Sequence, residues 1–234
     1  MRKTAFVFIN GILNFPWMRN AWTDLAAEYV TRNLGAEGHV GVKFEYFAGA
    51  LFRQWGQRKR AMDVLGLYNR LSRDGYRVVL VGHSNAAAII AYIVTEMEEQ
   101  LNNVHLFAPA AFDEDYEYAI KRGNLSGLFI YGSTNDRALG VGARFTQTIT
   151  FGMSGYGTMG LRGAEMEKKH PGIVFDFSNN SFGHGTWFDD EHFYDTMRLV
   201  MVNEGLMLTG DIAGVSRPMG SPQTPWVIQR LECR

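Results

Sequence analysis

Cysteine is almost absent from this chain of 234 residues, because the only one, Cys233, stands next to the C-terminal residue. No internal disulfide can form, and this composition suits a reducing compartment. Long apolar runs are also missing, since no stretch approaches the length that a membrane-spanning helix needs. The apolar residues 5–9 follow a basic N-terminus but are too few for the core of a signal peptide. We therefore expect a cytoplasmic protein without an integral membrane segment.

An excess of either charge is lacking as well. The 23 basic and 24 acidic residues leave a net charge of -1, which gives no general attraction to nucleic acid or to anionic membranes. No glycine-rich loop of the P-loop or dinucleotide-binding type follows a predicted strand. His184, His192 and the acidic residues at 189–191 do not have the spacing of a known metal motif, and a solvated helix start explains the acidic residues better. We expect no nucleic-acid partner, no cofactor and no metal, and the sequence leaves the oligomeric state open.

The chain does contain a regular alternation of short apolar strands and amphipathic helices. Strands are predicted at residues 5–9, 40–47, 78–81, 103–107, 128–131 and 173–177, and helices at residues 21–33, 53–73, 86–95, 113–122 and 189–202. The strands are nearly unbroken in apolar character, as expected when helices cover both faces of a sheet. The pattern predicts the α/β class, with a mainly parallel sheet of about six strands and helices on both faces. We expect one domain at 1–208 and a tail of little periodicity at 209–234.

One stretch, residues 76–91, combines a buried strand, the turn Gly-His-Ser-Asn-Ala and a helix rich in small residues. A tight turn with serine at its apex is strained, so the flanking residues must be small, and Gly82 and Ala86 meet that demand. Ser84 would stand above the carboxyl end of the sheet at a helix N-terminus, where partial positive charge stabilises an oxyanion. The alternative is a surface turn without chemistry, and the flanking strand and helix argue against it.

A serine hydroxyl is a weak nucleophile until a base takes its proton, and that base is most often a histidine oriented by a carboxylate. In an open α/β sheet such groups gather at the carboxyl ends of the strands. Asp136 follows the strand at 128–131 and His184 follows the strand at 173–177. The sequence therefore predicts that both residues lie at the same edge of the sheet as Ser84.

Both assignments have alternatives. Asp136 could be a turn residue, with Asp113 as the acid, although a helix cap also explains Asp113. His184 could be a loop residue held by hydrogen bonds, with His192 as the base, although His192 is expected on the terminal helix. His170 precedes the last strand and would lie at the wrong end of the sheet.

The chain order of serine, aspartate and histidine, with the pentapeptide at 82–86, resembles that of the α/β-hydrolase superfamily. Residues 132–136 resemble the Gly-x-x-x-Asp acid loop of that family, and residues 183–185 resemble its histidine loop. Asn10, followed by glycine, stands where the family's oxyanion loop opens with His-Gly. Asn10 in place of histidine and Ala86 in place of the more common glycine are two departures. The resemblance covers nearly the whole chain before the tail.

This resemblance implies a minimal esterase-like or lipase-like serine hydrolase with the α/β-hydrolase fold. By the same resemblance, Ser84 is the nucleophile, His184 is the general base and then the general acid, and Asp136 orients the imidazole. The backbone N–H groups of Ile12 and Asn85 are the implied oxyanion donors.

Residues 139–162 are a candidate flap over this site, because they are rich in glycine and methionine. Five apolar residues are predicted to line an acyl pocket, although for each taken singly packing in the core is the better interpretation: Phe15, Trp17, Phe107, Met153 and Tyr156. Together they favour a small-molecule ester with an apolar or aromatic acyl group. A thioesterase, lipase or peptidase would use the same residues, and a non-catalytic binding protein of this fold is the alternative from another class.

Overall fold

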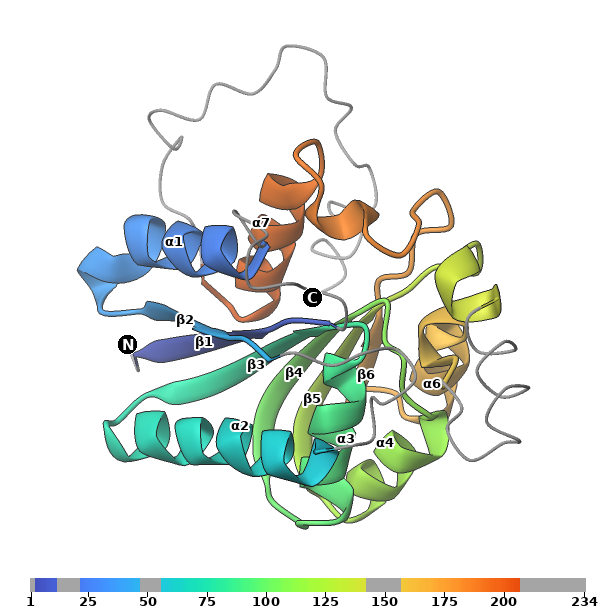
Figure 1. Cartoon of the computed structure of the whole chain (residues 1–234), viewed down its shortest axis with the longest axis horizontal. Coiled ribbons are helices and arrows are strands. Elements are labelled where there is room, and N and C mark those ends of the chain that lie inside the picture. Colours follow the sequence, from blue (N-terminus) through green and yellow to red (C-terminus); the bar gives the residue numbers. More distant parts are fainter. Residues whose placement is uncertain (1–2, 12–21, 47–55, 142–156, 207–234) are drawn as a thin grey trace.

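The structure, a computed structural model, describes residues 3–11, 22–46, 56–141 and 157–206 (Figure 1). The predicted tail at 209–234 and most of the candidate flap at 139–162 lie outside the described residues. Within the described ranges, no helix combines the length and the apolar character that crossing a bilayer requires.

Six parallel strands form one sheet, which confirms the predicted parallel sheet of about six strands, and their order is β2-β1-β3-β4-β5-β6. The strands are β1 (Thr4–Ile9), β2 (Val40–Phe44), β3 (Arg77–His83), β4 (Leu101–Phe107), β5 (Leu125–Tyr131) and β6 (Val174–Asp176). The strand order changes direction between β1 and β3, and in open α/β sheets ligands bind beyond the carboxyl ends at such a switch point. Ile9 pairs with Gly82 at that point, so the loops after β1 and β3 begin side by side.

Helices cover both faces of the sheet (Figure 1). α1 (Trp22–Leu34) and α7 (Phe193–Asn203) lie on one face, and the other face carries α2 (Gln57–Arg73), α3 (Ala86–Thr95), α4 (Asp113–Lys121) and α6 (Gly163–Lys169). Along β1, Phe6 and Phe8 join the core under α1 and α7, whereas Val7 and Ile9 join the core under α2, α3 and α4. Burial on both faces explains why the strands read as continuous apolar runs rather than alternating ones.

Several predicted boundaries or roles were wrong; for example, β4 and β5 begin at Leu101 and Leu125, ahead of the predicted residues 103 and 128. The second strand ends at Phe44 rather than at residue 47. Phe112 occupies the N-cap position of α4, so Asp113 is the first helical residue and not the cap. The last helix begins at Phe193, because a short 3₁₀ helix (Thr186–Phe188) and an extended Asp189 precede it, which leaves His192 just ahead of the helix.

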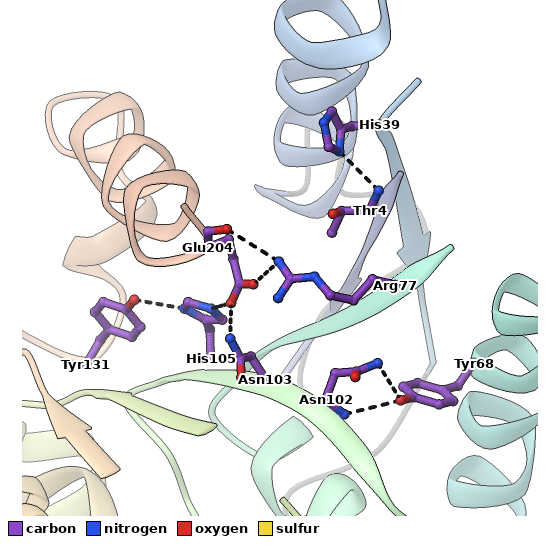
Figure 2. A network of polar contacts seen from close by, with 9 residues as sticks. All are labelled: Thr4, His39, Tyr68, Arg77, Asn102, Asn103, His105, Tyr131 and Glu204. Carbon is purple, nitrogen blue, oxygen red and sulfur yellow. Dashed lines mark hydrogen bonds and ion pairs between the residues drawn. The ribbon is translucent and has the colours of Figure 1, made fainter. Parts of the chain in front are cut away.

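A buried polar network fixes the C-terminal end of α7 on the sheet (Figure 2). The carboxylate of Glu204 is fully buried and accepts hydrogen bonds from His105 Nε2 at 2.7 Å and from Asn103 Nδ2 at 3.0 Å. It also pairs with the guanidinium of Arg77. The hydroxyl of Tyr131 contacts the other ring nitrogen of His105 at 2.8 Å. Side chains from β3, β4 and β5 therefore converge on the end of one helix.

Candidate active site

Ser84 lies at the sharp turn between β3 and α3. Its backbone φ of 55° falls in the left-handed region, which is unusual for a residue other than glycine. The turn is held from β4 and the loop after it: the Ser84 N–H donates to the Phe107 carbonyl at 2.9 Å, and the Ser84 carbonyl accepts from the Ala110 N–H at 3.1 Å. A Cβ at Gly82 would lie only 3.0 Å from the Cβ of Ala86, so the small residues permit the close approach of helix and strand.

Two hydrogen bonds link Ser84 to a histidine and a carboxylate from distant loops. His184 Nε2 lies 2.9 Å from Ser84 Oγ, and His184 Nδ1 lies 2.7 Å from Asp136 Oδ2. The carboxylate is an acceptor at neutral pH, so Nδ1 carries the ring proton and Nε2 accepts from the serine hydroxyl. Asp136 is almost fully buried, and its second oxygen accepts the Leu139 N–H at 3.0 Å. The imidazole is therefore oriented with its free lone pair toward the serine.

Asn180, which the sequence reasoning missed, joins the two loops that carry Asp136 and His184. Its side-chain oxygen accepts from the Thr134 N–H at 3.1 Å and from the Thr134 hydroxyl at 2.8 Å. Its main-chain carbonyl accepts from Asn135 Nδ2 at 2.6 Å. These three bonds bring the loop after β5 beside the loop after β6. No sequence motif marks Asn180, and only its place in a polar loop after a strand could have suggested it.

Gly11, the second residue after β1, lies close against the serine. A Cβ at Gly11 would lie 3.1 Å from Ser84 Cβ and 3.3 Å from His83 Nδ1, so a side chain there would crowd both residues. Asn10, the residue in place of the family histidine, fixes the start of the loop after β1. Its side-chain oxygen accepts the Gly11 N–H at 2.9 Å and the indole N–H of Trp22 at 3.2 Å.

Of the two implied oxyanion donors, one can be placed. Asn85 is buried at the N-terminal end of α3, directly after Ser84, and its side-chain amide donates to the Tyr46 hydroxyl at 3.0 Å. Ile12 lies outside the described residues. The positive end of the α3 dipole therefore faces the serine, which is the polarity that an oxyanion needs.

Crowding at Gly11 gives a testable prediction. Gly11→Val should lower kcat for p-nitrophenyl acetate by about 10- to 100-fold, because the added methyl groups push the loop away from Ser84. Gly66→Val is the matched control, since a Cβ at that exposed position of α2 meets no atom within 4 Å. Steady-state kinetics and thermal unfolding of both variants make the comparison. A fully active, folded Gly11→Val protein would show that the loop does not border the reacting atoms.

The alternative candidates for the acid and the base lie away from Ser84 or have other partners. Asp113 pairs with Arg162 at 3.2 Å, and His192 pairs through Nδ1 with Asp189 at 2.7 Å. His170 precedes β6, at the edge of the sheet opposite Ser84, as predicted. The structure thus brings Asp136 and His184 to the serine and leaves these three residues elsewhere.

The predicted acyl pocket is only partly visible. Phe15, Trp17, Met153 and Tyr156 lie outside the described residues. The pocket role predicted for Phe107 does not fit its position, because the ring is fully buried and stacks on Tyr131 with the centroids 4.1 Å apart. Phe107 is therefore a core residue.

A groove of about 1400 Å³ adjoins the acid and histidine loops. Asp136 and His184 form part of its wall, and apolar side chains such as Leu161 and Phe182 form another part. Among the residues that the structure describes, no three His, Cys, Asp or Glu side chains are grouped to hold a metal ion. The described residues that line the groove are thus a mixture of apolar side chains and polar ones such as Arg137 and Asn180, and Ser84 is not among them.

Comparison with known proteins identifies the fold. No protein-family model and no curated protein matches the sequence. Among solved structures, the chain is similar to the native thermophilic esterase Est2 of the planctomycete Thermogutta terrifontis, with 17% identity, a TM-score of 0.50, and 90% of this chain and 85% of that chain covered. It is also similar to TT1662 from Thermus thermophilus, with 12% identity, a TM-score of 0.50, and coverage of 86% and 89%. The chain has the α/β-hydrolase fold.

In the terms of the α/β-hydrolase fold, the serine, aspartate and histidine follow β3, β5 and β6, and all three lie at the carboxyl edge of the sheet. At 17% identity and below, the likeness establishes this fold alone. The chemistry has to be argued from the side chains of the site.

Proposed function

We propose that this protein is a serine hydrolase that cleaves a carboxylic ester of an apolar or aromatic acyl group through an acyl-enzyme intermediate. The observation that carries the proposal is the continuous chain of hydrogen bonds from Asp136 through His184 to Ser84, with the serine at a strained turn. A buried carboxylate, an oriented imidazole and a hydroxyl within 2.9 Å of it are the parts that activate a serine nucleophile.

In the acylation step, Ser84 Oγ attacks the ester carbonyl while His184 Nε2 takes the hydroxyl proton. Asp136 stabilises the imidazolium that forms and keeps Nδ1 protonated. The tetrahedral intermediate collapses, the carbon–oxygen bond of the ester breaks, and the imidazolium gives its proton to the departing alkoxide. The products of this step are an alcohol and an acyl group bonded to Ser84.

In the deacylation step, water takes the place of the alcohol. His184 accepts a proton from the water as it attacks the acyl carbonyl, and returns a proton to Ser84 Oγ as the carboxylic acid leaves. In both steps the negative oxygen would be stabilised by the N–H groups of Asn85 and Ile12 and by the dipole of α3. The buried N-terminal end of that helix beside Ser84 supports the first donor.

The apolar and aromatic residues predicted near the site support an apolar acyl group over a charged one. A thioesterase, a lipase or a peptidase would use the same three side chains, because the fold does not choose the leaving group. A panel of p-nitrophenyl esters with acyl chains of increasing length, compared with the matching thioesters, separates these substrates by kcat/KM.

Covalent labelling tests the proposal most directly. A fluorophosphonate probe should label the native protein, and mass spectrometry of its peptides should locate the adduct on Ser84, because such probes react with activated serines. Ser84→Ala should lose the label completely while it remains folded. Failure of the native protein to react would favour a non-catalytic binding protein of the same fold.

A further inference from the structure

His83, the residue before the serine, makes a direct contact with the loop of the proposed base. Its Nε2 lies 2.9 Å from the main-chain carbonyl oxygen of His184. Because a carbonyl is only an acceptor, Nε2 must carry a proton and donate it. This bond joins β3, which carries the serine, to the loop that carries the histidine.

Aromatic rings hold the imidazole of His83 in this orientation. The ring packs edge-on against Trp22 at a centroid distance of 6.3 Å and against Phe188 at 5.5 Å. Trp22 and Phe188 stack on each other at 3.9 Å, so the two rings form a single wall. The ring of His184 lies nearby, with the two centroids 5.0 Å apart. His83 is therefore fixed by packing as well as by its hydrogen bond.

The environment of His83 also sets its protonation state. Burial, reinforced by the nearby His184, lowers the pKa of His83 to about 4. The ring is neutral at the pH at which serine hydrolases work, and it places no second positive charge beside the imidazolium that forms on His184. A neutral donor of this kind can hold the loop without opposing the proton transfer.

We propose that His83 is a positioning residue for His184, and that its Nε2–H fixes the main chain of the histidine loop so that the base faces Ser84. The inference rests on the proposed function. His184 lies in a segment without regular secondary structure, between β6 and the 3₁₀ helix at Thr186–Phe188. On one side that loop is tied through Asn180 to the acid loop, and on the other it is tied through His83 to β3.

The hydrogen bond from His83 to the His184 carbonyl sets the distance between the proposed base and the proposed nucleophile. The bond from Asp136 fixes one end of the imidazole but allows the ring to swing about Nδ1, whereas the bond to the His184 carbonyl restrains the backbone from which the ring projects. A displacement of about 1 Å at reacting atoms can lower a rate by about 100-fold. His83 therefore acts on kcat rather than on substrate binding.

Variants that separate the donor from the ring test this role. His83→Phe keeps an aromatic ring but removes the donor, and it should lower kcat for p-nitrophenyl acetate by about 10- to 100-fold with KM changed less than about twofold. His83→Gln keeps an N–H near the position of Nε2 and should recover most of the lost kcat. His83→Met has a similar length to glutamine without a donor, and it supplies the comparison with His83→Gln if the phenylalanine variant does not fold.

The rate of fluorophosphonate labelling at Ser84 is the second readout. It should fall in the phenylalanine and methionine variants and recover in the glutamine variant, in parallel with kcat. Equal activity of His83→Gln and His83→Met, or a fully active His83→Phe, would overturn the positioning role. If the native protein itself does not label at Ser84, the proposed function fails instead, so the two failures are distinguishable.

Discussion

Alanine in place of His184 is expected to lower kcat for p-nitrophenyl acetate by about 10⁴- to 10⁶-fold, with little change in KM. The reason is that one substitution removes both hydrogen bonds of the site, at 2.9 Å to Ser84 and at 2.7 Å to Asp136. Under the proposed mechanism Ser84 then has no base to take its proton, and the residual rate would come from substrate binding and from the proposed oxyanion donors. Single-turnover release of p-nitrophenol from purified protein measures the loss.

His192→Ala is the control for this experiment, and it should leave kcat unchanged. The two histidines are closely matched: His192 also bonds a carboxylate through Nδ1 at 2.7 Å, and its side chain is 28% exposed against 26% for His184. They differ in that Nε2 of His184 contacts Ser84 Oγ, whereas the carboxylate partner of His192 is a neighbour three residues away in the chain. If His192→Ala were inactive and His184→Ala were active, the role of general base would have to be assigned to His192.

The largest loss of stability is expected at the other end of α7. Glu204→Leu should lower the free energy of unfolding by about 3–5 kcal/mol, because Arg77 and His105 lose their buried acceptor. Glu28→Leu is the matched control, since Glu28 pairs with Arg32 on the exposed side of α1 and should cost less than about 1 kcal/mol. Urea denaturation at pH 7, followed by tryptophan fluorescence, gives both values. Equal losses in the two variants would mean that the network in Figure 2 adds no more than a surface ion pair.

The loss of stability in Glu204→Leu should depend on pH, because the carboxylate of Glu204 titrates. Burial by itself would raise the pKa of Glu204, but the hydrogen bond from His105 and the charges of His105 and Arg77 outweigh it and hold the pKa below its ordinary value of 4.5. As the pH falls, the unfolded chain therefore takes up this proton first, so the stabilisation is full above about pH 4.5 and is lost below it. The difference in free energy of unfolding between the native protein and Glu204→Leu should therefore be larger at pH 7 than at about pH 4.

Much of the fold follows from simple patterns. Val78 to Val81 is an unbroken apolar run, which is typical of a parallel strand buried on both faces, and the run does form the interior of β3. The small residues after Ser84 predict a helix packed close to that strand, and α3 spans the predicted residues. Strand–helix alternation then fixes which ends of the strands share an edge, and for this reason the sequence alone predicts that Asp136 and His184 lie beside Ser84.

The sequence could not reveal contacts that depend on the path of a loop. Asn180 looks like any loop asparagine until its amide is seen between two loops. Phe107 was misassigned because a strand covered on both faces does not tell which side chains reach a pocket and which remain in the core. His192 was placed on a helix because its acidic neighbours resemble a helix start, whereas Asp189 bonds the main chain of His192 ahead of that helix.

The backbone at Ser84 also bears on how the protein could change over generations. A left-handed conformation costs an ordinary amino acid about 1–2 kcal/mol relative to glycine, which adopts it freely. Selection for heat resistance alone would therefore favour glycine at position 84, and selection for turnover would oppose it. The proposed nucleophile thus occupies a backbone position at which the folded chain is less stable than it would be with glycine.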